Sequence, residues 1–143
     1  MTVIRFATTC ALLLAALAVA ACGGDSKAEA AQNTVCDARA DISKQVDQLK
    51  GLTPATFTTE AASKSLNAIR SDLKDIAGAR EDLSDDRRQE VEQANQQFAG
   101  QVSDIVKQVF RSSTAADSKT QLTSAFQQLA DTYQKSYARI DCS

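Results

Sequence analysis

The chain has 143 residues, which is the length of one ordinary domain. Hydrophobic residues make up 43% and charged residues 24%, as in soluble globular proteins, which argues against a chain that is disordered throughout. The 16 basic and 18 acidic residues give a net charge of −2, which argues against a nucleic-acid-binding protein, because such a protein carries a basic patch or stripe. One proline and five glycines leave long segments unbroken and favour helices.

Residues 1–21 have the organisation of an export signal. Arg5 supplies a positive charge, and the apolar run is densest in "ALLLAALAVAA", from Ala11 to Ala21. That run is too short for a transmembrane helix, which needs about 20 apolar residues. Its length and flanking residues are typical of a signal peptide. We therefore expect a signal-peptide helix over residues 1–21 that precedes the domain and is removed on export.

The signal ends in "VAAC", the residues Val19 to Cys22, and this motif resembles the lipobox of bacterial lipoproteins. In that family a branched apolar residue and two small residues precede the cysteine that is lipidated. The resemblance implies cleavage before Cys22, diacylglycerol on its sulfur and often an acyl group such as palmitate on the new amino terminus. Two or three acyl chains hold a protein firmly at a membrane. Because Ala18-Val19-Ala20 also fits an ordinary secretory site, a plain secreted protein is the alternative.

The number of cysteines favours the lipoprotein interpretation. The chain has four cysteines, and Cys10 lies in the signal. Ordinary cleavage leaves an odd number in an exported chain, whereas lipidation of Cys22 leaves Cys36 and Cys142 to form one disulfide. Metal binding by this pair is the alternative, but the chain has no histidine and no CxxC pair. We predict a disulfide between Cys36 and Cys142, no metal site and no cofactor.

The remaining chain divides into a tether and a folded domain. Residues 22–34 contain the lipidated cysteine and the segment "GGDSKAEAAQNT", which is small and polar without an apolar period, so we expect a flexible tether. Over residues 35–143 apolar residues recur at helical spacing. No segment shows sustained alternation of period two, so the predicted fold class is all-α.

Four apolar stripes predict four amphipathic helices. The stripes consist of Val35, Ala38, Ile42, Val46 and Leu49; Ala62, Leu66, Ile69, Leu73, Ile76 and Leu83; Val91, Ala94, Phe98, Val102, Ile105 and Val109; and Leu122, Phe126, Leu129, Tyr133, Tyr137 and Ile140. Gly51 is expected to cap the first helix in a left-handed conformation, and Ser84 to separate the second helix from the third.

These helices predict an antiparallel up-down four-helix bundle. With an even number of antiparallel helices, the start of the first and the end of the fourth lie at the same end of the bundle. The predicted disulfide therefore joins the start of helix 1, at Cys36, to the end of helix 4, at Cys142, within the ~4.4–6.8 Å Cα separation that such a bond tolerates.

Much of the mature chain shows a second resemblance. The segments "VCDARADISKQVDQLKGL", "EVEQANQQFAGQV" and "YARIDC" are similar to small secreted helical proteins from actinobacteria that have terminal cysteines and no assigned activity. This resemblance implies a helical fold and an exported location, and it transfers no catalytic or binding residue. Together with the lipobox it predicts an extracytoplasmic protein that is lipid-anchored to the cell membrane.

The sequence lacks the residues of the common catalytic schemes. Without histidine, Ser-His-Asp and Cys-His arrangements are excluded. Ser71 and Lys74 match the S-x-x-K element of penicillin-recognising serine enzymes, but the companion S-D-N and K-T-G motifs are missing. The acids in "EDLSDDRR", Glu81 to Arg88, lack the spacing of a calcium loop. We therefore expect a protein that is not an enzyme.

The expected function is that of a helical interaction module of the cell envelope. At the end of the bundle away from the membrane, Leu52, Phe57 and Phe110 form a candidate docking cluster for a protein partner, because exposed apolar clusters mark interaction surfaces. The interpretation that we favour for these residues, however, is that they plug the open end of the bundle. Two other functions are open: a structural spacer without a ligand, and a carrier of a small apolar ligand between the helices, where small residues such as Ala62 and Ala94 leave room.

Overall fold

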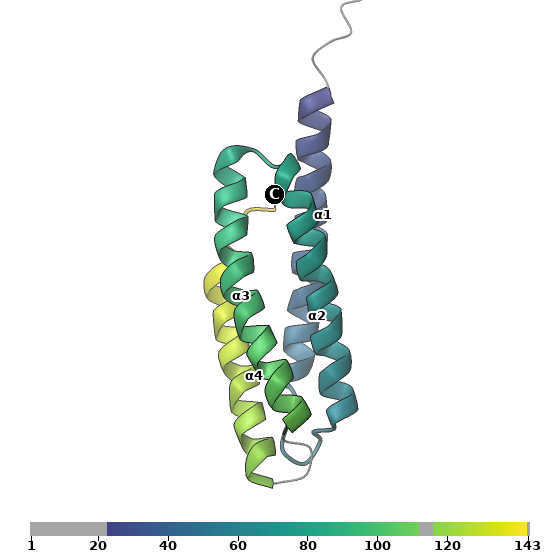
Figure 1. Cartoon of the computed structure of the whole chain (residues 1–143), viewed down its shortest axis with the longest axis vertical. Helices are drawn as coiled ribbons and strands as arrows, with labels where there is room; N and C mark the ends of the chain where they lie inside the picture. The colour runs from purple at the N-terminus through teal and green to yellow at the C-terminus, as the bar shows by residue number, and fades with distance from the viewer. Residues whose placement is uncertain (1–22, 112–115, 143) are drawn as a thin grey trace, which may run out of the picture.

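The computed structural model describes residues 23–111 and 116–142. It is an antiparallel up-down bundle of four helices (Figure 1). The helices are α1 (Gly23–Lys50), α2 (Thr59–Ala79), α3 (Asp85–Arg111) and α4 (Ala116–Ser136), and the short 3-10 helices η1 (Arg80–Asp82) and η2 (Tyr137–Arg139) follow α2 and α4. These two described ranges contain no strand. The predicted fold class is confirmed.

The four predicted apolar stripes form the core of the bundle, and every one of their members is buried. In the interior, Phe98 makes edge-to-face contacts with Tyr133 and Tyr137, with ring centroids 6.1 and 5.5 Å apart. The small residues Ala62 and Ala94 lie in the same core and allow the helices to approach closely. Aromatic rings therefore fill the part of the core around Phe98.

Helix α1 begins earlier than the sequence predicted. Residues 23–34, which we expected to be a flexible tether, form its first turns, and these turns project beyond the other helices (Figure 1). The expectation was based on the lack of large apolar side chains, but residues 28–30 are alanine and glutamate, which are strong helix formers. Ala31 is only 5% exposed and extends the core stripe by one turn. The predicted flexible tether is therefore wrong for residues 23–34.

The end of α1 also differs from the prediction. Gly51 does not adopt the left-handed conformation, since no glycine in the described part of the chain has a positive φ. Its N–H donates a hydrogen bond of 3.0 Å to the carbonyl of Asp47, and the N–H of Leu52 donates to the carbonyl of Leu49 at 3.1 Å. The helix therefore ends by tightening its last turn rather than by a left-handed glycine cap.

The chain leaves the helical path before its last cysteine. The fourth stripe predicted a helix through Ile140, whereas α4 ends at Ser136 and the 3-10 turn η2 follows. Cys142 then lies against α1, where it is bonded to Cys36. The separation of α2 from α3 at Ser84 agrees with the prediction, because α3 begins at the next residue.

Candidate functional site

The two cysteines that were predicted to pair form a disulfide. The Sγ atoms of Cys36, on α1, and Cys142, beyond η2, are 2.01 Å apart, and their Cα atoms are 5.7 Å apart. Because both sulfurs are bonded, neither is a free thiolate that could attack a substrate or bind a metal. Among the described residues, no group of three or more histidine, cysteine or carboxylate side chains is placed to hold a metal ion.

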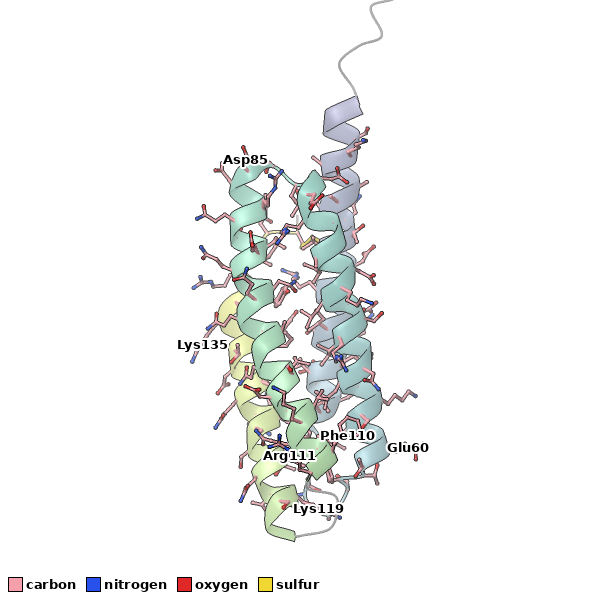
Figure 2. All side chains as sticks on the ribbon, in the orientation of Figure 1. Glu60, Asp85, Phe110, Arg111, Lys119 and Lys135 are labelled. Atoms are coloured by element: carbon pink, nitrogen blue, oxygen red, sulfur yellow. A yellow bond between two sulfur atoms is a disulfide. The ribbon has the colours of Figure 1, made fainter. Side chains whose placement is uncertain are left out.

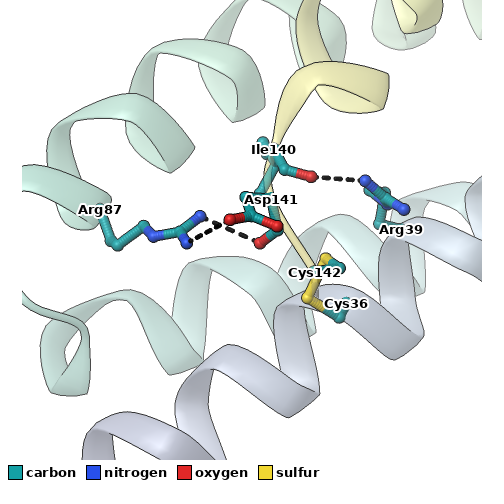
Figure 3. A network of polar contacts seen from close by, with 6 residues as sticks. All are labelled: Cys36, Arg39, Arg87, Ile140, Asp141 and Cys142. Carbon is teal, nitrogen blue, oxygen red and sulfur yellow. Dashed lines mark hydrogen bonds and ion pairs between the residues drawn. A yellow bond between two sulfur atoms is a disulfide. The ribbon is translucent and has the colours of Figure 1, made fainter.

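Two arginines bind the same C-terminal segment from opposite sides (Figure 3). Arg39 of α1 donates a hydrogen bond to the carbonyl of Ile140. Arg87 of α3 donates to the carbonyl of Asp141 at 3.0 Å and forms an ion pair with its carboxylate at 3.5 Å. We call these contacts and the disulfide the C-terminal clasp. The clasp therefore joins the end of the chain to both α1 and α3.

The predicted lipidation site, Cys22, and the signal over residues 1–21 lie outside the described residues. Lipid anchoring therefore stays a prediction. Within the described ranges, none of the helices combines the length and apolar character that crossing a bilayer requires.

The three residues of the predicted docking cluster do not form one exposed surface. Phe57 is 4% exposed and stacks on Phe126 with ring centroids 6.3 Å apart. Leu52 is partly buried against the core. Phe110 is 67% exposed, at the end of α3 nearest the start of α2 (Figure 2). Leu52 and Phe57 therefore close the end of the bundle, as the favoured interpretation predicted, whereas Phe110 is available for contact.

A hollow that sequence reasoning missed lies between α2 and α3. It has a volume of about 550 Å³, is open to solvent, and is called here the α2–α3 groove. Its polar lining consists of Asn67, Arg70, Ser71 and Lys74 of α2 and Asn95 and Ser103 of α3. Its apolar lining consists of Leu73, Ala77 and Ala99. This volume lies in the range of ligand-binding sites, ~300–1,000 Å³.

The side chain of Asn95 is held in the groove by two hydrogen bonds. Its Oδ1 accepts from the hydroxyl of Tyr137 at 2.6 Å, and its Nδ2 donates to the carbonyl of Leu73 at 3.5 Å. Burial, and to a lesser degree the neighbouring Tyr133, raises the pKa of Tyr137, so this hydroxyl keeps its proton and remains a donor. The network connects the groove to the core and fixes the position of the amide.

The charged side chains that line the groove are both basic. Arg70 and Lys74 line the groove, whose described lining contains no carboxylate, and the ion pairs among the described residues involve neither of them. Asp72 of the same helix does not line the groove. Burial raises its pKa, with smaller contributions from the carboxylates of Asp41 and Asp75. The groove therefore carries local positive charge in a chain whose net charge is −2.

A shallow apolar cleft continues the groove toward the end of α3. It is lined by Ser63, Leu66, Asn67, Val106, Val109 and Phe110, and we call it the apolar shelf. Asn67 lines both hollows. From Ala77 to Ser63 the combined surface extends about 20 Å along α2, at ~1.5 Å per residue.

Two residues noted for other reasons in the sequence belong to this groove. Ser71 and Lys74, the residues of the S-x-x-K match, both line it. A signal for the groove was present in α3, where Asn95, Ala99 and Ser103 recur at a spacing of four beside the buried stripe. In the sequence alone, such a row of small and polar residues cannot be distinguished from an ordinary solvent-exposed helix face. The position of α2 shows that it lines a groove.

Comparison with models of known protein families found no matching family. Searches of curated proteins and of solved structures also found no match. The function is therefore inferred from the geometry of the groove and the clasp.

Proposed function

We propose that this protein is a membrane-anchored extracytoplasmic lipoprotein whose helical bundle binds another component of the cell envelope and catalyses no reaction. The observation that supports binding is the α2–α3 groove, an open hollow of about 550 Å³. Amide, hydroxyl and basic side chains line it, and they offer hydrogen bonds and positive charge to an incoming surface. The binding site in this proposal is the groove, in place of the cluster at the end of the bundle.

The geometry of α1 suits an anchor at Cys22. The helix starts at Gly23 and continues without a break through Cys36, a span of about 20 Å at ~1.5 Å per residue. Lipid on Cys22 would hold the clasp end of the bundle toward the membrane and direct the end that carries Phe110 away from it. The groove would then face the surrounding envelope along the side of the bundle.

The alternative functions differ in what they require of the bundle. A carrier needs room for an apolar ligand between the helices, where the rings of Phe98, Tyr133 and Tyr137 are packed together. A structural spacer needs only the length and rigidity of the helices. The spacer is therefore the alternative that an experiment on the groove has to exclude.

Replacing Cys22 with serine is expected to abolish lipid attachment, because the serine hydroxyl does not replace the thiol to which the diacylglycerol is joined. The measurement is incorporation of an alkyne-labelled fatty acid into the tagged full chain in bacterial cells. The matched control is Cys10→Ser, which removes a thiol from the predicted signal and should leave the labelling unchanged. Equal labelling of the Cys22→Ser variant and the unaltered chain would contradict the predicted anchor.

A photo-crosslinking amino acid at Ser103 is expected to capture an envelope component in intact cells, because this exposed residue lines the groove. The matched control position is Gln134, which is exposed on α4. Mass spectrometry of the crosslinked products should identify a species that is reproducibly captured from Ser103 and absent from Gln134. Identical capture from both positions, or none from Ser103, would leave the spacer as the better interpretation.

A further inference from the structure

We propose that the occupant of the α2–α3 groove is an acidic amphipathic helix of a partner protein. This inference rests on the proposed binding function and adds the chemical class of the partner. It follows from the charge of the groove, from its shape and from the apolar shelf beside it.

The basic side chains of the groove would be complemented by carboxylates on the partner. Arg70 and Lys74 lie one helical turn apart, and like charges at this spacing destabilise a helix slightly unless an opposite charge compensates them. No carboxylate lines the groove among the described residues. Glu92, close to Asn95 in α3, is already paired with Arg80 at 3.1 Å. Two acidic residues one turn apart on a partner helix match the spacing of the two basic residues.

The shape of the groove favours an extended occupant over a small anion. Its hydrogen-bonding side chains are distributed along the helices from Asn67 to Lys74 and from Asn95 to Ser103, so they do not converge on one point. The backbone of both helices is hydrogen-bonded within each helix, so the groove offers no edge to which a strand could add. An amphipathic helix laid in a groove is the recognition mode that fits an elongated lining between two helices. The small side chains of the lining let the backbone of such a helix approach closely.

The apolar shelf adds a third requirement for the partner. Phe110 is 67% exposed and lies in the shelf beside Ser63 and the partly buried Val106. From Lys74 to Ser63 the distance along α2 is about 16 Å, or about three helical turns. A partner helix that pairs its two acids with Arg70 and Lys74 would therefore cover Phe110 with a large apolar residue. That residue lies about three turns from the acid that pairs with Lys74.

The probe for this inference is a fluorescent synthetic helical peptide with two glutamates one turn apart and a leucine two turns beyond the second glutamate, which places it three turns from the first. We expect it to bind the purified full chain in a non-ionic detergent, measured by fluorescence anisotropy, and to bind more weakly as salt rises. The double variant Arg70→Glu/Lys74→Glu should weaken binding by about tenfold. An unchanged affinity, or equal binding of a peptide with lysines in place of the glutamates, would overturn the inference.

The matched control reverses the same amount of charge on α4. The variant Lys119→Glu/Lys135→Glu should change the affinity by less than about twofold, because neither residue lines the groove. An equal loss in this control would show that only the net charge matters and would overturn the assignment. Circular dichroism and the urea midpoint of each variant verify that the bundle is intact.

A second variant tests the groove without changing charge. Ser103→Trp places a bulky ring in the hollow and should also weaken peptide binding by about tenfold, whereas Gln108→Trp places the same ring on α3 outside the groove and should not. If both tryptophan variants bind the peptide like the unaltered chain, the peptide does not occupy the groove and the inference fails.

Two further measurements separate other occupants from a partner helix. Binding of phosphatidylglycerol vesicles that is lost in Arg70→Glu/Lys74→Glu, without binding of the peptide, would assign the groove to a lipid surface. Self-association in sedimentation that is lost in the same variant would assign it to a second copy of the chain. Either result overturns the inference. If the crosslinker at Ser103 captures a specific component while the acidic peptide does not bind, the proposed function stands and only the class of partner is wrong.

Discussion

Removal of the disulfide is expected to lower the free energy of unfolding by about 4 kcal/mol. Cys36 and Cys142 are 106 residues apart in the sequence, so the bond closes nearly the whole folded domain into one loop. In the chain-entropy model such a bond stabilises the native state mainly by restricting the unfolded chain, and the effect grows with the length of the loop. A loss of this size is comparable with the whole stability of a small domain.

The measurement is equilibrium urea unfolding of the double variant Cys36→Ala/Cys142→Ala, followed by far-ultraviolet circular dichroism. The comparison is Arg87→Ala, which removes polar contacts of the same C-terminal clasp and leaves the covalent bond in place. We expect this variant to lose about 1 kcal/mol, since the ion pair is partly exposed to solvent. A loss in the double variant no larger than that of Arg87→Ala would contradict the covalent explanation.

Truncation of Phe98 is expected to lower the free energy of unfolding by about 3–5 kcal/mol. This side chain is fully buried and contacts the rings of Tyr133 and Tyr137. Phe98→Ala removes the apolar surface and leaves a cavity that neighbouring rings cannot fill without leaving their rotamers. The hydrogen bond from Tyr137 to Asn95 is next to this cavity, so the position of the groove amide also depends on it.

The matched control is Phe110→Ala, the same substitution in the same helix at an exposed position. Because Phe110 is 67% exposed, we expect its truncation to change stability by less than about 0.5 kcal/mol. The comparison uses the urea midpoints of both variants, provided that the unfolding free energy depends on urea concentration with the same slope in each. An equal loss of unfolding free energy in Phe98→Ala and Phe110→Ala would contradict the prediction that burial of Phe98 in the core stabilises the bundle.

The helices were predictable because their apolar residues follow one period. In α3 the predicted stripe, from Val91 to Val109, is also the set of residues that the helix buries. A helix with one apolar face has to bury that face, so the stripe determines both the element and its orientation toward the core. The pairing of Cys36 with Cys142 was likewise predictable, because an even number of antiparallel helices brings these residues to one end.

The start of α1 and the role of Phe57 were harder to predict, because small and isolated apolar residues are ambiguous. Ala31 contributes little to an apolar pattern, yet it extends the core stripe and is buried. Phe57 lies in a loop, where periodicity gives no information, and its burial depends on the ring of Phe126 in a helix far along the chain. In both cases a neighbouring element decides whether the side chain is covered.

The sequence by itself determined the helical class, the four buried stripes and the cysteine pair, because each depends on local spacing or on counting. Only the tertiary structure decided that Arg70 and Lys74 of α2 share a groove with Asn95 and Ser103 of α3, and that Phe110 is exposed at the end of the adjoining shelf. The physical reason is that a surface hollow forms between two helices whose residues are distant in the chain. Which polar faces meet is determined by how the buried faces pack, and no single helix carries that information.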